Sequence, residues 1–196
     1  MAASAVRPVL LALLPLAMDR EASIWRGLLA SLVAFAAIGC ASVSTPGAAG
    51  AGPAGDVAYA NEAAGWTISY PRGWTIDAAD PGLVKLRGEN PTAQIGIHVF
   101  LADESRSLES VVDLVLANLP PKQFRLVSRR NFTLPAGYQA IEIVHHIGTG
   151  TLGKSRKVFT IAKGRGFLID AETFLDSWAA AEPSFNRVID SFMVRD

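Results

Sequence analysis

The chain has 196 residues, with 18 basic and 18 acidic side chains and a formal net charge of zero at pH 7. That balance gives no electrostatic argument for binding nucleic acid, and a single cysteine excludes an internal disulfide and a cysteine metal cluster. Length and composition indicate one domain with appended segments, because residues 58–196 have an ordinary globular composition and suffice to bury a core.

The N-terminal segment has the pattern of an export signal. Two arginines, Arg20 and Arg26, precede an apolar run without charged side chains over residues 27–39. This run is shorter than the ~20 residues of a membrane-spanning helix but suits the apolar part of a secretory signal. A signal counted from Met1 is longer than usual, so we expect Met18 to be the true start. The pattern predicts that residues 1–39 are a signal peptide.

The predicted signal ends at the only cysteine of the chain. Ala37-Ile38-Gly39-Cys40 resembles the lipobox of bacterial lipoproteins, in which the thiol is acylated and the signal is cut before it. The resemblance implies a lipid anchor at Cys40 and a place in the cell envelope, on the periplasmic face of the outer membrane in a Gram-negative cell. The alternative is an ordinary cleavable signal with an incidental Cys40. Residues 40–57 are then the lipidated cysteine and a tether of small residues, glycine and proline.

The remaining residues alternate between strand and helix patterns. Period-two alternation predicts strands over residues 66–70, 74–76, 83–87, 94–101, 124–134, 138–147, 154–163 and 166–172. Helical spacing predicts one helix after the N-cap Ser107 and a last helix with Pro183 in its first turn and Trp178 on a separate turn before it. Short connections between successive strands predict an α+β domain with an antiparallel sheet.

Both ends of residues 60–196 resemble PsbP-like domains. The opening Gly65-Trp66-Thr67-Ile68-Ser69-Tyr70-Pro71 is followed by Gly73-Trp74, and the chain closes on Asp190-Ser191-Phe192. The resemblance implies an antiparallel sheet sandwiched between helices, a PsbP-like α/β/α sandwich. It also implies a family of non-enzymatic accessory proteins and transfers no catalytic residue to this chain.

Residues 148–155 satisfy the P-loop pattern G-x-x-x-x-G-K-[ST]. A phosphate cradle requires a helix directly after Lys154, because its N-terminal amides hold the phosphates. Residues 156–161 instead alternate as a strand does. We therefore predict a hairpin loop in which Lys154 is exposed, and no nucleotide binding.

We interpret His145 separately from the pair His146 and His98. His145 lies in line with isoleucines on its strand, which favours a place in the core. His146 shares a strand face with Glu142, and a meeting with His98 across the sheet would supply two imidazoles and a carboxylate for a metal ion. No spacing here is diagnostic, so we predict no metal site.

The basic side chains of the domain allow two interpretations, and the tryptophans allow one. Seven basic residues are expected to cluster on neighbouring strands and hairpin ends: Arg129, Arg130, Lys154, Arg156, Lys157, Lys163 and Arg165. Such a face is usually only solvated, but it can also dock an acidic partner or anionic headgroups. Trp66, Trp74 and Trp178 are expected in the core.

Together these patterns predict a membrane-tethered accessory or binding module that is not an enzyme. Its partners are membrane lipid through Cys40 and an unknown protein, with no cofactor. One alternative is a carrier of a small apolar ligand held between sheet and helix. Another is an exported hydrolase or metal enzyme, although the sequence has no G-x-S-x-G motif.

Overall fold

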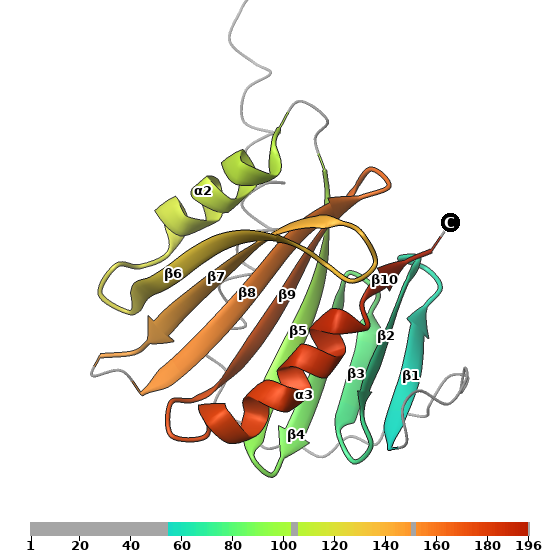
Figure 1. Cartoon of the computed structure of the whole chain (residues 1–196), viewed down its shortest axis with the longest axis horizontal. Coiled ribbons are helices and arrows are strands. Elements are labelled where there is room, and N and C mark those ends of the chain that lie inside the picture. The colour runs from blue at the N-terminus through green and yellow to red at the C-terminus, as the bar shows by residue number, and fades with distance from the viewer. Residues whose placement is uncertain (1–54, 103–105, 150–151, 196) are drawn as a thin grey trace, which may run out of the picture. The chain divides into compact units, whose positions relative to one another are not determined.

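The computed structural model describes residues 55–102, 106–149 and 152–195 (Figure 1). All of them belong to the unit Ser44–Asp196. The predicted signal peptide over residues 1–39, Cys40 and most of the predicted tether lie outside the described residues.

Ten strands and two helices make up the described part. The strands are β1 (Asp56–Asn61), β2 (Trp66–Pro71), β3 (Thr75–Asp80), β4 (Leu83–Glu89), β5 (Thr92–Leu101), β6 (Phe124–Thr133), β7 (Gln139–Ile147), β8 (Gly153–Ala162), β9 (Arg165–Phe174) and β10 (Met193–Val194). The helices are α2 (Leu108–Asn118) and α3 (Trp178–Asp190). Two of these strands, β1 and β10, were not predicted, and β1 begins two residues before the expected domain boundary at residue 58.

The strands form two antiparallel sheets. The larger sheet has the order β3-β4-β5-β9-β8-β7-β6, and the smaller has the order β1-β2-β10. After β5 the chain passes through α2 to the far edge strand β6 and returns by successive hairpins to β9, which pairs with β5. The antiparallel arrangement expected from the short connections is confirmed.

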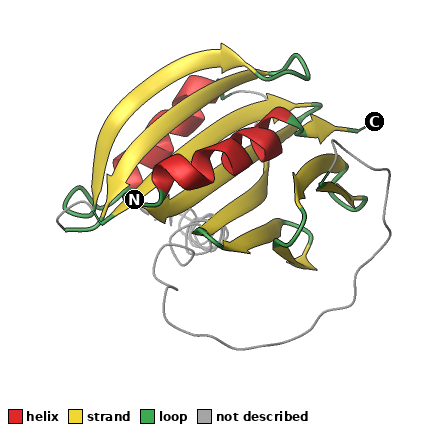
Figure 2. Ribbon diagram, turned by 60° about the horizontal axis from the view of Figure 1, so that its bottom comes forward, coloured by secondary structure: helices red, strands yellow, loops and turns green. Residues whose placement is uncertain are grey.

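The two helices pack on opposite faces of the larger sheet. In α2 the Asp113 carboxylate accepts a hydrogen bond from Arg129 of β6, whereas in α3 the Asn186 amide oxygen accepts one from Arg156 of β8. Arg129 pairs with Ile143 of β7, which pairs with Lys157 of β8, so Arg129 and Lys157 point to the same face of the sheet. Arg156 precedes Lys157 on β8 and therefore points to the other face. The helices cover the sheet only in part, and the described part is mostly sheet (Figure 2). Neither described helix is long and apolar enough to cross a membrane.

The last helix differs from the prediction. It begins at Trp178, so Pro183 lies inside it rather than in its first turn, and Trp178 is part of the helix. The physical reason is burial, because Trp178 is 7 % exposed and its ring lies 5.4 Å from that of Phe185, about two turns further along the same helix face. Packing this extra apolar turn outweighs the loss of the proline N–H donor.

The two sequence segments that resemble PsbP-like domains contact each other. Ser191, at the end of α3, accepts a hydrogen bond at its hydroxyl oxygen from the backbone N–H of Ser69 in β2 at 2.8 Å. The ring of Phe192 lies 6.1 Å from that of Trp66, and both side chains are completely buried. The short motifs therefore join the small sheet, α3 and the core. Trp66 and Trp178 are buried as predicted, and Trp74 is half-buried against the same core.

Candidate functional site

A cluster of buried charged side chains lies on the face of the central strands that carries α2. Lys157 of β8 donates to one carboxylate oxygen of Asp170 in β9, and its Nζ lies 3.7 Å from Oε1 of Glu172. The Ser155 hydroxyl donates to the other oxygen of Asp170 at 2.9 Å, and the Gln94 amide donates to Glu172 at 3.0 Å. We name these five residues the Lys157 cluster. Lys157 is 3 % exposed, and Ser155 and both carboxylates are buried as well, whereas Gln94 is half-buried.

One ammonium group faces two carboxylates in this cluster. Burial, together with the charge of Asp170, raises the pKa of Glu172 from 4.5 to about 7. Lys157 and the hydrogen bond from Gln94 oppose that rise without cancelling it. Glu172 therefore exchanges a proton near neutral pH, and the protonated form leaves one cation and one anion in the buried site.

Two histidines lie on the same sheet face as the Lys157 cluster. Burial lowers the pKa of His98 and of His145 to about 4, so both rings are neutral at neutral pH. Neither ring nitrogen of His145 has a hydrogen-bond partner among the described residues. The core position predicted for His145 is confirmed, since the side chain is 1 % exposed.

The geometry of the Lys157 cluster does not assemble a serine nucleophile. The hydroxyl of Ser155 donates to a carboxylate and not to an imidazole, although His145 is its register partner on β7. Nucleophilic catalysis requires a base within hydrogen-bond reach and access for the substrate. Ser155 is completely buried. This buried hydroxyl, bonded to Asp170, is therefore not placed to attack a substrate.

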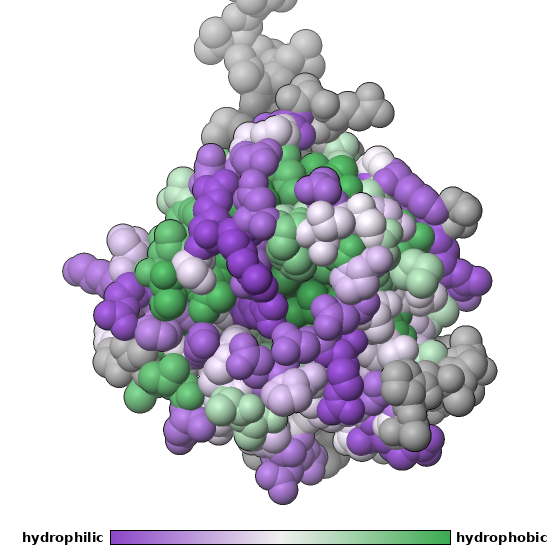
Figure 3. Space-filling model, in the orientation of Figure 1, coloured by the Kyte–Doolittle hydropathy of each residue, from purple (hydrophilic) through white to green (hydrophobic). Residues whose placement is uncertain are grey.

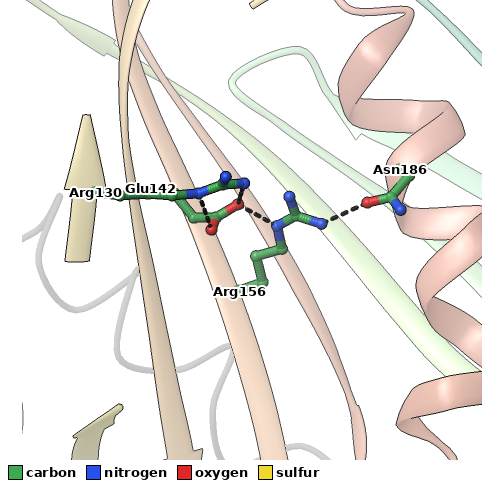
Figure 4. A network of polar contacts seen from close by, with 4 residues as sticks. All are labelled: Arg130, Glu142, Arg156 and Asn186. Atoms are coloured by element: carbon green, nitrogen blue, oxygen red, sulfur yellow. Dashed lines mark hydrogen bonds and ion pairs between the residues drawn. The ribbon is translucent and has the colours of Figure 1, made fainter. Parts of the chain in front are cut away.

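A second polar network lies on the other face of the sheet, the one that carries α3 (Figure 4). Arg130 of β6 donates through two nitrogens to both oxygens of Glu142 in β7, at 2.7 and 3.1 Å. Arg156 donates to Glu142 at 2.5 Å and to Asn186 of α3 at 2.5 Å. We name these four residues the Glu142 network. It ties the outer strands to α3 across the uncovered part of the sheet.

The Glu142 network carries a net positive charge. Burial by itself raises the pKa of Glu142, but hydrogen bonds and charges from Arg130 and Arg156 outweigh it and hold the pKa below the ordinary value. Two guanidinium groups thus share one carboxylate. The Arg130 side chain is 57 % exposed while that of Glu142 is 7 % exposed. The charge presented to solvent is therefore the outer guanidinium.

The side chains considered for a metal site do not meet. His146 and Glu142 share a strand face as predicted, but His98 points to the opposite face, toward Asp170 and Lys157. Strands β8 and β9 also separate β7 from β5. The part of the chain that the structure describes holds no group of three or more His, Cys, Asp or Glu suited to a metal ion.

The expected single cluster of basic residues does not form. Arg129 and Arg130 are neighbours on a strand and point to opposite faces. Lys157 is buried between carboxylates, and Arg165 donates to the carbonyl oxygen of Ala64 at 2.5 Å, at the other end of the molecule. Arg130 and Arg156 do come together, in the Glu142 network.

The P-loop pattern ends on a strand, since its last three residues, Gly153 to Ser155, open β8. β8 begins at Gly153, so no helix follows Lys154, and the predicted strand is confirmed. The prediction that Lys154 is an exposed loop residue is wrong, because it is half-buried in β8 and its Nζ lies 4.1 Å from the ring centroid of Trp178. A strand directs its amides into the sheet ladder, where they cannot converge on a phosphate.

Sequence reasoning missed the Lys157 cluster, although a signal was present. In β9 the residues Leu168, Asp170 and Glu172 alternate with Phe167, Ile169 and Ala171, which are all buried. A strand with apolar residues on one face and two acids on the other usually has the acidic face in solvent. Here Lys157 of β8 lies against both acids, and both sides of the strand are buried.

Solved structures share this arrangement of strands and helices. The domain is similar to cyanobacterial PsbP (CyanoP) from Synechocystis, with a TM-score of 0.58 and 18 % identity over 76 % of this chain and 97 % of that one. It is also similar to a protein of unknown function from Pseudomonas aeruginosa, with a TM-score of 0.51 and 17 % identity over 72 % and 98 %. LpqN of Mycobacterium tuberculosis, which is involved in cell envelope biogenesis, gives a TM-score of 0.49 and 14 % identity over 67 % and 83 %.

No known family profile matches the sequence, and no curated protein matches it either. The described part is an α+β domain built on an antiparallel sheet. More particularly, its fold is PsbP-like, as the motifs around Trp66 and Phe192 predicted. At these identities the likeness establishes the fold and no activity.

Proposed function

We propose that this protein is a lipid-anchored accessory protein of the cell envelope whose PsbP-like domain binds another protein and catalyses no reaction. The observation that carries the proposal is the Glu142 network, which holds the half-exposed guanidinium of Arg130 in place on an open sheet face. Because Glu142 already fixes this side chain, a partner carboxylate that meets it costs little additional rotamer entropy.

The surroundings of the Glu142 network suit an extended protein contact. Residues 125–131 of the edge strand β6 are all exposed. In Figure 3 a hydrophilic band runs over β6 to β8, with hydrophobic surface on both sides. In this proposal α2 and α3 are the two outer layers of an α/β/α sandwich, and they leave this part of the sheet open. A mixed surface with an ordered arginine is typical of a non-obligate interface.

The anchor in this proposal is Cys40. It is the only cysteine of the chain, and it follows the apolar run at the position where a lipobox ends. Each buried methylene of an acyl chain contributes ~0.8 kcal/mol to membrane binding, and stable anchoring takes more than one chain. The proposed location is the exported side of the envelope.

Two measurements test the proposal. Cells grown with an alkyne fatty acid should label the wild-type protein and not Cys40→Ser, and equal label on both would reject the anchor. Proteins crosslinked to the full-length chain in native membranes should include a band that Arg130→Glu abolishes. Arg129→Glu is the matched control, because this neighbour points to the other face and pairs with Asp113. Identical crosslinks for both variants would reject the Arg130 face as the contact.

An exported hydrolase is the second candidate, because Ser155, Glu172 and His145 converge on one face and shifted pKa values often mark active sites. The closed position of Ser155 and its bond to Asp170 weigh against it. Turnover of generic ester or peptide substrates that Ser155→Ala removes, without loss of the folded state, would favour the hydrolase. The carrier of a small apolar ligand has no specific observation in its favour.

A further inference from the structure

Exposed apolar side chains gather at one end of the domain. The backbone N–H of Leu175 donates to the carbonyl oxygen of Leu152 at 3.1 Å, which brings the turn before β8 next to the turn before α3. Leu152 is 68 % exposed and Leu175 is 40 % exposed. We name this region the apolar end, and it comprises Leu126, Val127, Leu152, Phe174 and Leu175. Such side chains are costly in water when they are grouped, so their place calls for a partner surface.

Strand register places the first described residues along the same edge of the fold as this end. Asp56 of β1 pairs with Pro71, after which the chain turns directly into β3. The pairs Thr75 with Arg87, Ala93 with Thr173, and Gly153 with Phe174 then lead across the larger sheet along one edge to Leu152. Figure 1 shows the start of β1 and the connection from β9 to α3 along the same lower edge. The chain therefore enters the domain along the same edge of the fold that carries the apolar end, with several strands of the larger sheet between the two places.

Charged side chains at this end are mainly basic. The basic ones are Arg72, Lys122, Arg125 and Lys154. The acidic ones on the same turns and strand ends are Glu89, Asp176 and Asp56, of which Asp56 is buried and paired with Arg187 of α3. Basic residues near an anionic bilayer contribute about 1 kcal/mol each. Apolar side chains flanked by basic ones are the combination that binds at the boundary between headgroups and acyl chains.

The length of chain between Cys40 and β1 indicates which partner surface covers the apolar end. In this proposal residues 41–55, which are rich in glycine, alanine and proline, are a flexible tether, and a flexible chain of this length has a root-mean-square end-to-end distance of about 20 Å. A lipid at Cys40 thus keeps the start of β1 close to the bilayer. We propose that the apolar end lies on the lipid surface, with Leu152 and Leu175 in the interfacial region. This inference depends on the proposed anchor at Cys40.

The test uses the full-length lipoprotein reconstituted in phosphatidylglycerol-containing vesicles. Because Cys40 is the only native cysteine, Leu152→Cys introduces one thiol for an environment-sensitive dye once Cys40 is acylated. Leu101→Cys is the matched control, since Leu101 is also an exposed leucine, 90 % exposed, but pairs with Arg165 at the opposite end. We expect the dye at residue 152 to shift to the blue and to be quenched by brominated lipid, and the dye at residue 101 to do neither.

The possible results distinguish failure of the lipid contact from failure of the anchor at Cys40. Equal quenching at residues 152 and 101 on an acylated protein, or stronger quenching at residue 101, would overturn the lipid contact and leave the anchor intact. Labelling of Cys40 itself by maleimide in the wild-type protein would show that it is not acylated, which would overturn the anchor and the inference together. Leu175→Cys gives an independent second reading and should match residue 152.

Discussion

Replacing Glu172, the buried glutamate of the Lys157 cluster, by glutamine removes its titration and so measures how much that titration contributes to the pH dependence of stability. Glu172→Gln keeps the side-chain volume and an oxygen that can accept from Gln94. The new amide can donate toward Asp170, and the single positive charge of Lys157 then meets a single negative charge. The variant should therefore fold, and its stability should no longer depend on the protonation of residue 172.

The expected size follows from the pKa of Glu172. The folded pKa is about 7, against 4.5 as the ordinary value, so the folded state binds the proton more tightly. Stability from this group is fully present below pH 4.5 and is lost as the pH rises toward 7. The shift corresponds to about 3 kcal/mol in full, of which about 2–3 kcal/mol falls between pH 5 and pH 8. Glu172→Gln should gain that amount relative to the wild type over this interval.

Comparing Glu172→Gln with the wild type cancels the opposing pH dependence that two buried histidines give to stability. The lowered pKa of His98 and His145 makes stability fall as the pH drops from 6.5 toward 4, and both proteins share it. Urea unfolding at pH 5 and pH 8 with linear extrapolation gives the two differences directly. Glu62→Gln is the control, because this glutamate is 76 % exposed in a surface ion pair with Arg195 that contributes little. A pH-independent difference for Glu172→Gln would refute the reasoning.

Three other outcomes follow from the described contacts. His145→Phe should be more stable than the wild type at pH 5 by about 1–2 kcal/mol and similar at pH 8. The reason is that the imidazole, with a pKa of about 4 in the folded state, stays neutral at pH 5 while the same group in the unfolded chain is protonated, which favours unfolding of the wild type. Equal loss of stability of both proteins between pH 8 and pH 5 in chemical unfolding would contradict this. Lys154→Ala should lower stability by about 0.5–1 kcal/mol through loss of its contact with Trp178, and neither protein should give heat on calorimetric titration with Mg-ATP; micromolar binding lost in the variant would revive the P-loop. A fragment of residues 55–196 should melt cooperatively and at a higher temperature than residues 58–196, which lack the first ladder pairs of β1; identical melting curves would show that those pairs contribute nothing.

Local patterns in the sequence determined most of the secondary structure. Alternation along residues 94–101 and helical spacing after Ser107 depend on backbone periods of two and 3.6, which are properties of neighbouring residues. The same reasoning placed His145 in the core and identified a strand after Lys154. The motifs around Trp66 and Phe192 predicted the PsbP-like fold, because these residues form the junction between the small sheet and α3.

Tertiary structure alone decided which charged side chains meet. Lys157 and Asp170 become partners only because β8 and β9 pair in one particular register, and α2 then packs on the face that carries them. Likewise Arg130 and Arg156 share Glu142, while Arg129 is directed to the other face. Pairing register and the packing of helices depend on contacts between residues far apart in the chain, and a one-residue shift would reverse every side chain. Local patterns in the sequence therefore specified most of the elements, and the way the elements pack specified the candidate sites.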